Sequence, residues 1–206
     1  MSKKYDTLKY YNENAEKYFE QTINADFDIN YRKFLKHIKK NSFILDFACG
    51  SGRDSKFFIG KGYKVRAIDG SYKMCEIASE YINQKVDCIE FKDFNEENIY
   101  DAIWACSVIL HIEEENLKDI LIKLIKALKN EGIIYFSFKK GKGSEIFEGK
   151  LYNYMTKEDL LNILSNIGFN YEIKEYYETI SSTDKIRKSV WANLVIKFNK
   201  TLEKSV

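Results

Sequence analysis

Apolar and polar positions recur along this chain with two different spacings, which predict strands and helices in turn. Short apolar runs, typical of buried strands, occupy residues 43–47, 63–68, 87–91, 101–106 and 132–138. Stretches with an apolar residue at every third or fourth position, typical of amphipathic helices, occupy about residues 53–60, 72–82 and 114–129. This succession predicts a mostly parallel sheet covered by helices.

The last third of the chain adds a helix and two more strands. Thr156 precedes a helical pattern and has Asp159 three residues further on, an arrangement related to the capping box. Two strand patterns follow at about 170–178 and 190–198, with no helical pattern between them. We therefore expect an α/β three-layer sandwich with a mostly parallel seven-stranded sheet and a C-terminal antiparallel hairpin.

The first 40 residues are polar and aromatic, with helical spacing. Tyr11 and Tyr18 are seven positions apart, which places them on one face of a helix, and a break is expected at residues 21–28. No linker-like stretch follows. We therefore expect a single domain over residues 1–206, in which residues 1–40 form a helical N-terminal segment.

Small, acidic and aromatic residues follow the predicted strands, at the edge where open parallel sheets bind ligands. After the first strand, Gly50 and Gly52 allow a ligand to approach the backbone closely. Asp69 ends the second strand, where an acidic side chain can accept both hydroxyls of a ribose. Asp93 and Phe94 follow the third, where a carboxylate suits an adenine amine and an apolar side chain suits the base face. Three such features in this order predict a nucleoside site.

The glycine-rich loop also limits the kind of nucleoside. The third glycine of a nicotinamide-binding motif is replaced by Ser55, and the Gly-Lys-Ser/Thr of a Walker-type loop is absent. Arg53 is the one basic residue in the loop, and the neighbouring Asp54 offsets its charge. The loop therefore favours a cofactor without phosphates.

Composition contributes mainly exclusions. The net charge is +2 and the pI about 8.1, a balance that predicts neither nucleic-acid nor membrane partners. The four cysteines have no CxxC spacing and there are two histidines, so no metal site is expected. No apolar stretch has the length of a signal peptide or a membrane span. We expect a cytoplasmic protein with free thiols, as a monomer or homodimer.

Taken together, the strand-end residues resemble those of the class I S-adenosylmethionine-dependent methyltransferases, which have a Rossmann-like fold. The resemblance covers about residues 5–200, and it is carried by D-x-x-C-G-S-G from Asp46, by Asp69, by K-D-F and by DAIWACSVILHI. Within that superfamily the chain is most similar to small bacterial methyltransferases with CGSGRDS, A-x-x-x-L-H, SFK and Y-x-x-Y/F-T-x-E-x-L segments. It is less similar to tellurite-resistance methyltransferases.

The resemblance implies a role for each residue of the loop. Asp46 would orient the loop and the methionine ammonium of the cofactor. The backbone of Gly50 and Gly52 would lie along the methionine part, and Arg53 would reach its carboxylate. Ala48 stands where many members have glycine, which a negative φ would tolerate.

The other implied cofactor contacts come from the N-terminal segment and the remaining strand ends. They are Tyr11, Asp69 at the ribose, Gly70, Ser71, Met74, Asp93 and Phe94 at the adenine, and Ser107 beside the sulfonium. In related enzymes an N-terminal segment folds over the cofactor, so residues 1–40 are expected to form a lid.

The candidate catalytic residues are His111, Tyr18 and Tyr154. Because the sulfonium methyl is already activated, the protein mainly aligns the reactants and excludes water. His111 has the pKa range of a general base, and the alternative is that it caps the next helix or packs beside the cofactor. The acceptor pocket is expected to draw on Lys139, Lys140, Tyr152, Tyr154, Arg187 and Trp191.

These features predict an S-adenosylmethionine-dependent methyltransferase with a small-molecule acceptor, since there is no added recognition domain and no basic face. Within enzymes, the alternative acceptor is an oxyanion such as tellurite or a macromolecule. A non-catalytic module that binds S-adenosylmethionine is the alternative from another class, and a nicotinamide oxidoreductase is a more distant one. An open acceptor cavity beside the methyl group would favour the methyltransferase.

Overall fold

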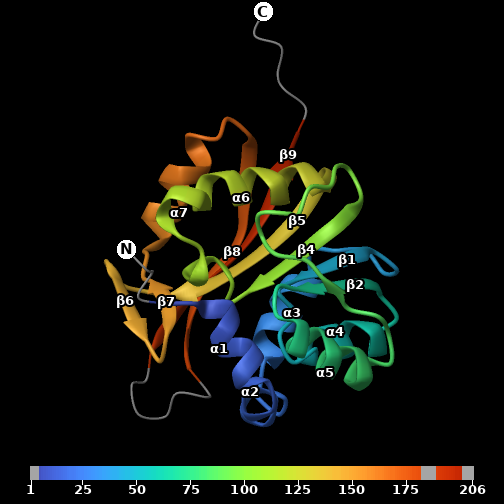
Figure 1. The fold of residues 1–206 in the computed structure, drawn as a ribbon. Coiled ribbons are helices and arrows are strands. Elements are labelled where there is room, and N and C mark those ends of the chain that lie inside the picture. Colours follow the sequence, from blue (N-terminus) through green and yellow to red (C-terminus); the bar gives the residue numbers. More distant parts are fainter. Residues whose placement is uncertain (1–4, 182–188, 201–206) are drawn as a thin grey trace, which may run out of the picture.

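The computed structural model describes residues 5–181 and 189–200, and within them one large sheet runs through the centre of the molecule (Figure 1). Its strands are β1 (Phe43–Phe47), β2 (Lys64–Asp69), β3 (Asp87–Cys88), β4 (Tyr100–Cys106), β5 (Leu128–Lys139), β8 (Asn170–Ile180) and β9 (Val190–Asn199). The helices are α1 (Thr7–Glu13), α2 (Ala15–Thr22), α3 (Asp28–Leu35), α4 (Arg53–Gly60), α5 (Tyr72–Ile82), η1 (Ile109–His111), α6 (Glu114–Ala127) and α7 (Lys157–Ser165). A small separate hairpin consists of β6 (Ser144–Phe147) and β7 (Lys150–Asn153).

The strand order β3-β2-β1-β4-β5-β9-β8 confirms the predicted Rossmann-like three-layer sandwich. Strands β1 to β5 are parallel, and β9 runs antiparallel between β5 and β8. The chain leaves β1 toward β2 and β3 on one side, then returns to β4 on the other. This reversal between β1 and β4 opens a crevice at the carboxyl ends of the strands, where open α/β sheets bind ligands.

Both faces of the sheet are buried, as the apolar strand patterns predict. Along β1, Leu45 belongs to the core beneath α6 and α7, whereas Ile44 belongs to the core formed with α3 and α4. The ribbon shows α6 and α7 on one face and α3, α4 and α5 on the other (Figure 1). Helix α7 begins with a full capping box between Thr156 and Asp159, which the sequence pattern anticipated.

Three differences from the sequence-based expectations affect the region of the site. Tyr11 and Tyr18 lie on two helices, because the side chain of Asn14 donates to the carbonyl of Tyr10 (2.9 Å) and the helix ends there. Strand β3 ends at Cys88 and not at residue 91, because the chain turns over residues 91–93.

The third difference is the β6–β7 hairpin, which the sequence analysis did not predict. Its two-residue turn is Glu148-Gly149, and both residues have positive φ (50° and 75°). Positive φ at both central positions is the geometry of the tight hairpin turns that favour Gly at the second position. The E-G dipeptide between two short apolar segments was therefore a usable signal.

The carboxylate of Asp54, buried at the start of α4, joins three elements of the fold. It accepts hydrogen bonds from the Tyr31 hydroxyl (2.5 Å) and the Trp104 indole (2.7 Å). Arg53 adds two more from its guanidinium, at 2.6 and 2.9 Å. Burial acts to raise the pKa of Asp54, but the Arg53 guanidinium outweighs it and the pKa is lowered. Helix α3, helix α4 and strand β4 are thus tied to one ionised group.

Replacing Asp54 with Asn tests this tie. The variant leaves the mostly buried Arg53 without its counter-ion, and we expect it to lower the free energy of unfolding by about 3–5 kcal/mol in urea. Tyr31→Phe removes one neutral donor and should cost about 1 kcal/mol. Asp101→Asn, at a more exposed ion pair, serves as the control. Equal losses for Asp54→Asn and Asp101→Asn would contradict this account.

Candidate functional site

Two adjoining cavities lie at the carboxyl ends of the parallel strands. The β2-side cavity, about 810 Å³, is lined by the end of β2, the turn after β3, the N-terminal segment and α6. The β5-side cavity, about 610 Å³, is lined by α2, the loop after β1, the ends of β5 and β9, and the β6–β7 hairpin. Both volumes fall within the range of small-molecule sites.

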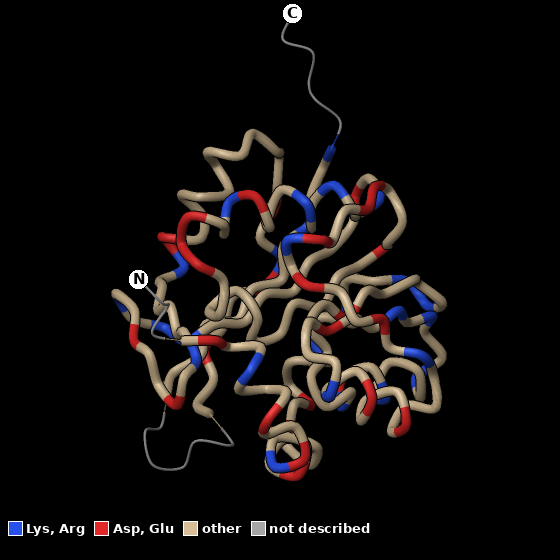
Figure 2. The backbone as a smooth tube through the Cα atoms, viewed as in Figure 1, with Lys and Arg blue, Asp and Glu red and all other residues tan. Residues whose placement is uncertain are grey.

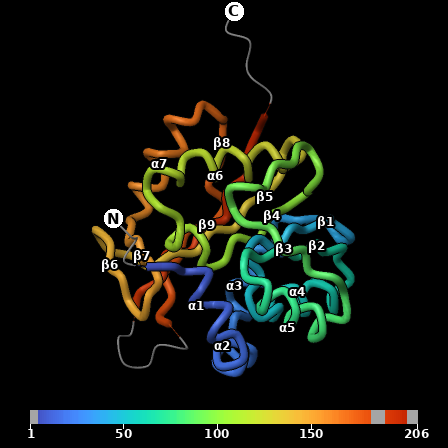
Figure 3. Tube along the Cα trace, viewed as in Figure 1, coloured from blue at the N-terminus to red at the C-terminus, as the bar shows by residue number. Residues whose placement is uncertain are grey.

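The two cavities meet along one shared wall. Its members come from α1, α2, the β1–α4 loop, the end of β4 and η1, and they are Tyr11, Tyr18, Ala48, Gly50, Cys106, Ser107 and His111. We call this set the junction. The sequence analysis singled out all seven, Cys106 only as a residue at the end of its strand. Figure 3 shows how the blue N-terminal segment passes close to the strand ends that supply the other members.

The β1–α4 loop at the junction contains several residues in the left-handed region. Ala48 has φ 60° and Gly50 has φ 53°. The sequence analysis expected Ala48 to be tolerated at a negative φ, and that expectation is wrong. A left-handed alanine costs on the order of 1 kcal/mol, which the surrounding fold must offset. At Gly50 a Cβ would lie 3.4 Å from the Tyr18 ring, an ordinary van der Waals contact, so the positive φ and not a lack of space favours glycine there.

Asp69 ties this loop to the end of β2. One carboxylate oxygen accepts from the Gly50 amide (2.9 Å) and the other from the Ser71 amide (2.8 Å). Burial raises the pKa of Asp69 above its usual value, and the backbone donors oppose that shift. Asp69 and the adjacent Gly70 line the β2-side cavity. The carboxylate therefore sits where the sequence predicted it.

The structure does not bring Asp93 and Phe94 to the cavity. Asp93 is exposed, and Phe94 is 1% exposed in the core with its ring 5.2 Å from that of Phe47. Glu90 and Phe91 line the β2-side cavity in their place. The difference follows from the early end of β3, which places the turn three residues sooner.

Three further residues that were predicted to contact the cofactor lie outside both cavities. Ser71 caps α5 by accepting from the Met74 amide (3.2 Å), and its hydroxyl donates to Asn12 (2.7 Å). Met74 is fully buried. Asp46 is 2% exposed and accepts from the Ser55 hydroxyl (2.6 Å), and burial raises its pKa. None of the three predicted residues lines either cavity.

Gly52 and Arg53 complete the loop. Gly52 has φ 78° and precedes α4, and a side chain there would meet Ile82 at 3.0 Å. Arg53 lines the β5-side cavity, where its guanidinium lies 3.6 Å from the Phe27 ring centre and binds Asp54. Its reach toward a cofactor carboxylate stays a prediction.

His111 is hydrogen-bonded at both ring nitrogens. Nδ1 lies 2.6 Å from the Leu151 carbonyl, and Nε2 lies 3.1 Å from the Tyr11 hydroxyl. A carbonyl only accepts, so Nδ1 carries the proton and Nε2 accepts from Tyr11. Burial, with a smaller contribution from the cations of Lys150 and Lys139, lowers the pKa of His111 to about 4. The ring is neutral, with its lone pair directed at Tyr11.

Tyr154, the third candidate catalytic residue, does not line either cavity. Its hydroxyl donates to Glu145 on strand β6 of the β6–β7 hairpin. Tyr152, two residues earlier, lines the β5-side cavity and has its ring centre 5.0 Å from that of His111. Lys139 and Trp191 line the same cavity, whereas Lys140 is exposed. Arg187 lies outside the described residues.

Lys150 and Phe147 are lining residues that the sequence analysis missed. Both belong to the β6–β7 hairpin, so the Glu148-Gly149 turn was the signal that would have found them. Thr22 and Phe27 also line the cavity from the segment that was treated only as a break.

Comparison with known proteins agrees with this geometry. Residues 44–132 match the family model described as a methyltransferase domain. The fold is similar to that of 1,6-didemethyltoxoflavin-N1-methyltransferase from Burkholderia thailandensis, crystallised with 1,6-didemethyltoxoflavin and S-adenosylhomocysteine. The TM-score is 0.73 at 14% identity, over 93% of this chain and 85% of that chain. A SAM-dependent methyltransferase from Archaeoglobus fulgidus gives a TM-score of 0.69 at 15% identity, over 92% of this chain and all of that one (100%).

Two curated relatives come from Methanocaldococcus jannaschii. Uncharacterized protein MJ0906 is 30% identical over 176 residues, which is 74% of this chain and 46% of the relative. Uncharacterized protein MJ1252 is 30% identical over 132 residues, which is 63% of this chain and 50% of the relative. The chain spans about half the length of these curated relatives.

The fold is that of the Rossmann-like methyltransferases. Among residues 5–181 and 189–200, no helix has the length and apolar character needed to cross a membrane.

The neutral state of His111 gives a pH prediction. An unfolded histidine has a pKa of about 6.5, so protonation favours the unfolded chain as the pH falls from there toward 4. We expect the wild type to lose stability over that interval by at most about 1.4 kcal/mol per pH unit relative to His111→Gln. In a His37→Gln background, NMR titration should report His111 alone. A midpoint above pH 6 would show that the ring is not held neutral.

Proposed function

We propose that this chain is an S-adenosylmethionine-dependent methyltransferase that methylates a small organic molecule. The observation that carries the proposal is the pair of cavities that meet at the junction. One has an acidic strand end that suits an adenosine, and the other is open for a second ligand. A module that only binds the cofactor has no need for the second cavity.

The β2-side cavity suits the cofactor in the chemistry of its lining. Asp69 would hold the ribose hydroxyls, because each carboxylate oxygen accepts one backbone donor and keeps a second lone pair. Glu90 would accept from the adenine amine, and Phe91 would pack against the base. At Gly70 a Cβ would lie 2.8 Å from a methyl group of Leu8, so a larger residue would displace that side chain of α1 from the strand end.

S-adenosylmethionine supplies a methyl group on a positively charged sulfur, which a nucleophile can take directly. The protein therefore has to align the acceptor and keep water out. Tyr11 and Tyr18, whose ring centres are 5.1 Å apart, form an aromatic cover over Gly50 that serves both needs. The Nε2 atom of His111 accepts a proton from any acceptor group that displaces the Tyr11 hydroxyl, which makes it the general base of the proposal.

Several observations support a small acceptor. The β5-side cavity of about 610 Å³ is lined by side chains from many separate parts of the chain, among them α2, the β1–α4 loop and the β6–β7 hairpin. Along the described backbone, Lys and Arg positions are interspersed with Asp and Glu positions in the view of Figure 2. The methyltransferase from Burkholderia thailandensis, which is similar in fold, was crystallised with the small molecule 1,6-didemethyltoxoflavin and S-adenosylhomocysteine bound.

Calorimetric titration with S-adenosylhomocysteine, S-adenosylmethionine and NAD tests the cofactor. We expect the sulfur nucleosides to bind and NAD not to bind. Asp69→Asn and Glu90→Gln should each weaken binding by about 1–3 kcal/mol, since each removes a charged acceptor. Asp93→Ala, at the exposed neighbouring aspartate, is the matched control and should leave the affinity unchanged. Absence of sulfur-nucleoside binding, or loss in the control alone, would refute the assignment.

Hydrogen exchange tests the proposed lid over residues 1–40. Helices α1 and α2 contribute the Tyr11 and Tyr18 rings to the junction, so a ligand there should hold both helices in place. We expect S-adenosylhomocysteine to slow exchange of the amides of residues 8–22 by about tenfold or more, while α7 amides stay unchanged. Uniform protection of both regions would point to global stabilisation instead of a lid.

A further inference from the structure

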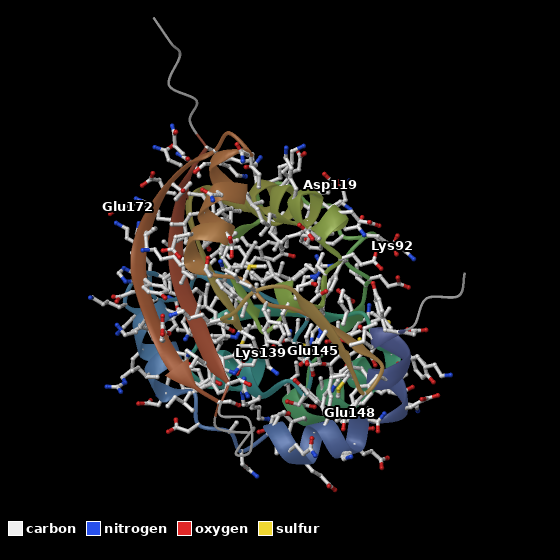
Figure 4. All side chains as sticks on the ribbon, turned by 90° about the vertical axis from the view of Figure 1, so that its left-hand side faces the viewer. Lys92, Asp119, Lys139, Glu145, Glu148 and Glu172 are labelled. Carbon is white, nitrogen blue, oxygen red and sulfur yellow. The ribbon has the colours of Figure 1, made fainter. Side chains whose placement is uncertain are left out.

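Neutral polar side chains form a hydrogen-bonded network beside the β5-side cavity. The members are Asn30 of α3, Tyr135 of β5, Thr179 of β8 and Asn193 of β9. The orange and red strands of Figure 4 are β8 and β9, which pair along one side of the sheet. Asn30 is 5% exposed and Asn193 is 1% exposed, yet both line the cavity, as does Thr179. Buried amides of this kind have their hydrogen bonds made, so the direction of each can be worked out from its partners.

The amide of Asn193 has only one possible orientation. One end of it lies 3.3 Å from the Tyr177 carbonyl and 3.1 Å from the Trp191 carbonyl. Carbonyl oxygens only accept, so this end is the Nδ2 donor and Oδ1 is at the other end. The same Nδ2 lies 3.1 Å from the Thr179 hydroxyl. The backbone of β8 and β9 therefore fixes the direction of this amide.

Asn193 in turn fixes the orientation of Asn30. The Oδ1 atom of Asn193 accepts from the Tyr135 hydroxyl (2.7 Å), and one end of the Asn30 amide lies 2.9 Å from the same oxygen. Two oxygens would repel each other at this distance, so that end is Nδ2, which also lies 2.8 Å from the Tyr135 hydroxyl. Burial raises the pKa of Tyr177, and Tyr135 and Asn30 oppose that shift, as donors do. The Asn30 nitrogen thus faces the network, and its oxygen faces away.

The Asn30 oxygen is open toward the cavity. Among residues 5–181 and 189–200, Oδ1 of Asn30 accepts no hydrogen bond, and the Tyr177 hydroxyl is the one side-chain N or O atom that is both sealed from solvent and without a partner. The Asn30 oxygen is therefore accessible. Because the side chain is otherwise buried and lines the cavity, a ligand there can reach that oxygen. The network holds the amide in place, so it offers an acceptor and cannot turn to offer its NH2 group instead.

Aromatic side chains line the same cavity. They include Phe27, three residues before Asn30, together with Tyr152 of β7 and Trp191 of β9. One face of the Phe27 ring is already covered by the Arg53 guanidinium, 3.6 Å from the ring centre. Aromatic walls give a planar ring a large contact area at little cost in conformational entropy. The cavity therefore suits a flat ring that has a hydrogen-bond donor at its edge.

We propose that the acceptor is a planar heterocycle with a ring N–H group, and that this group donates to the Oδ1 atom of Asn30. The word acceptor rests on the proposed function, whereas the recognition of the N–H group does not. Asn30 then determines specificity. A ring with an oxygen at the same position would place its lone pairs against those of the Asn30 oxygen and would be rejected.

Binding of matched heterocycles tests this recognition without any cofactor. The probes are 2-quinolone with coumarin, and indole with benzofuran; within each pair the shape is the same and a ring N–H is replaced by a ring oxygen. In NMR titrations we expect the N–H member of at least one pair to bind about tenfold more tightly than its oxygen analogue, which corresponds to one hydrogen bond. No preference in either pair, absence of binding included, would overturn the proposal.

Two variants distinguish contact with Asn30 from a structural effect. Asn30→Leu keeps the approximate size of the side chain, removes the oxygen and should abolish the preference. Tyr135→Phe removes a member of the same network that does not line the cavity. It should retain the preference, because the Asn30 amide still donates to Asn193. Equal losses in the two variants would assign the effect to the network and refute the contact.

Exchange of side-chain amide protons tests the orientation of Asn30 in the unaltered protein. Because its Nδ2 lies within the network, we expect the Nδ2 protons to exchange with solvent at least about tenfold more slowly than those of the exposed Asn116. A bound N–H ligand should also shift the signal of the Asn30 side-chain carbonyl carbon. Rapid exchange at Asn30 would mean that the amide is turned the other way, which excludes the proposal.

This proposal and the proposed function can fail separately. An N–H preference that Asn30→Leu abolishes, in a protein that does not bind S-adenosylhomocysteine, would keep the recognition site and remove the methyltransferase. Binding of S-adenosylhomocysteine without an N–H preference would keep the proposed function and remove the heterocyclic acceptor.

Discussion

The ionised carboxylate of Asp54 is the constraint on which the position of the site depends. Taking a carboxylate out of water is costly, and here four hydrogen bonds, two of them from Arg53, offset that cost. Because the donors come from α3, α4 and β4, the carboxylate fixes those elements relative to one another. The β1–α4 loop ends beside it, so the end of the left-handed turn that begins at Ala48 is fixed by the same carboxylate. The guanidinium of Arg53, which the same carboxylate binds, lies over the Phe27 ring, and both side chains line the β5-side cavity.

The central fold was predictable because its sheet is buried on both faces. Strand β1 and helices α4 and α5 have the predicted boundaries, since apolar runs and glycine-rich ends left little choice. The errors fall where local side-chain interactions decide at which residue a helix or strand ends. Asn14 ends a helix by bonding the carbonyl of Tyr10, a competition that periodicity does not register. The β6–β7 hairpin is exposed on one side and too short to produce a clear pattern of its own.

The part of the candidate site proposed for the cofactor was largely predictable from the sequence. The register of the parallel strands brings their carboxyl ends to one edge of the sheet. Residues at or just after those ends, such as Gly50, Asp69 and Ser107, therefore lie close together. Glu90 and Phe91 were missed in favour of Asp93 and Phe94, because the end of a two-residue strand is decided by the turn after it. The acceptor side was harder, since Lys150 and Tyr152 reach the junction only through the hairpin. The proposed nucleoside site depends on residues at the strand ends, which the sequence pattern locates. The proposed acceptor site depends on side chains that only the tertiary fold brings together.

Helix α1 and the β6–β7 hairpin, about 140 residues apart in sequence, are hydrogen-bonded to each other. The Asp6 amide donates to the Gly149 carbonyl (3.1 Å), the Leu151 amide to the Thr7 hydroxyl (3.2 Å), and the Tyr10 hydroxyl to Glu148 (3.1 Å). Helix α1 borders the cavity proposed for the cofactor, and the hairpin borders the cavity proposed for the acceptor. If residues 1–40 act as the proposed lid, these three hydrogen bonds couple its movement to that of the hairpin, so the two cavities would open and close together. The release rate of each ligand would then depend on whether the other is bound.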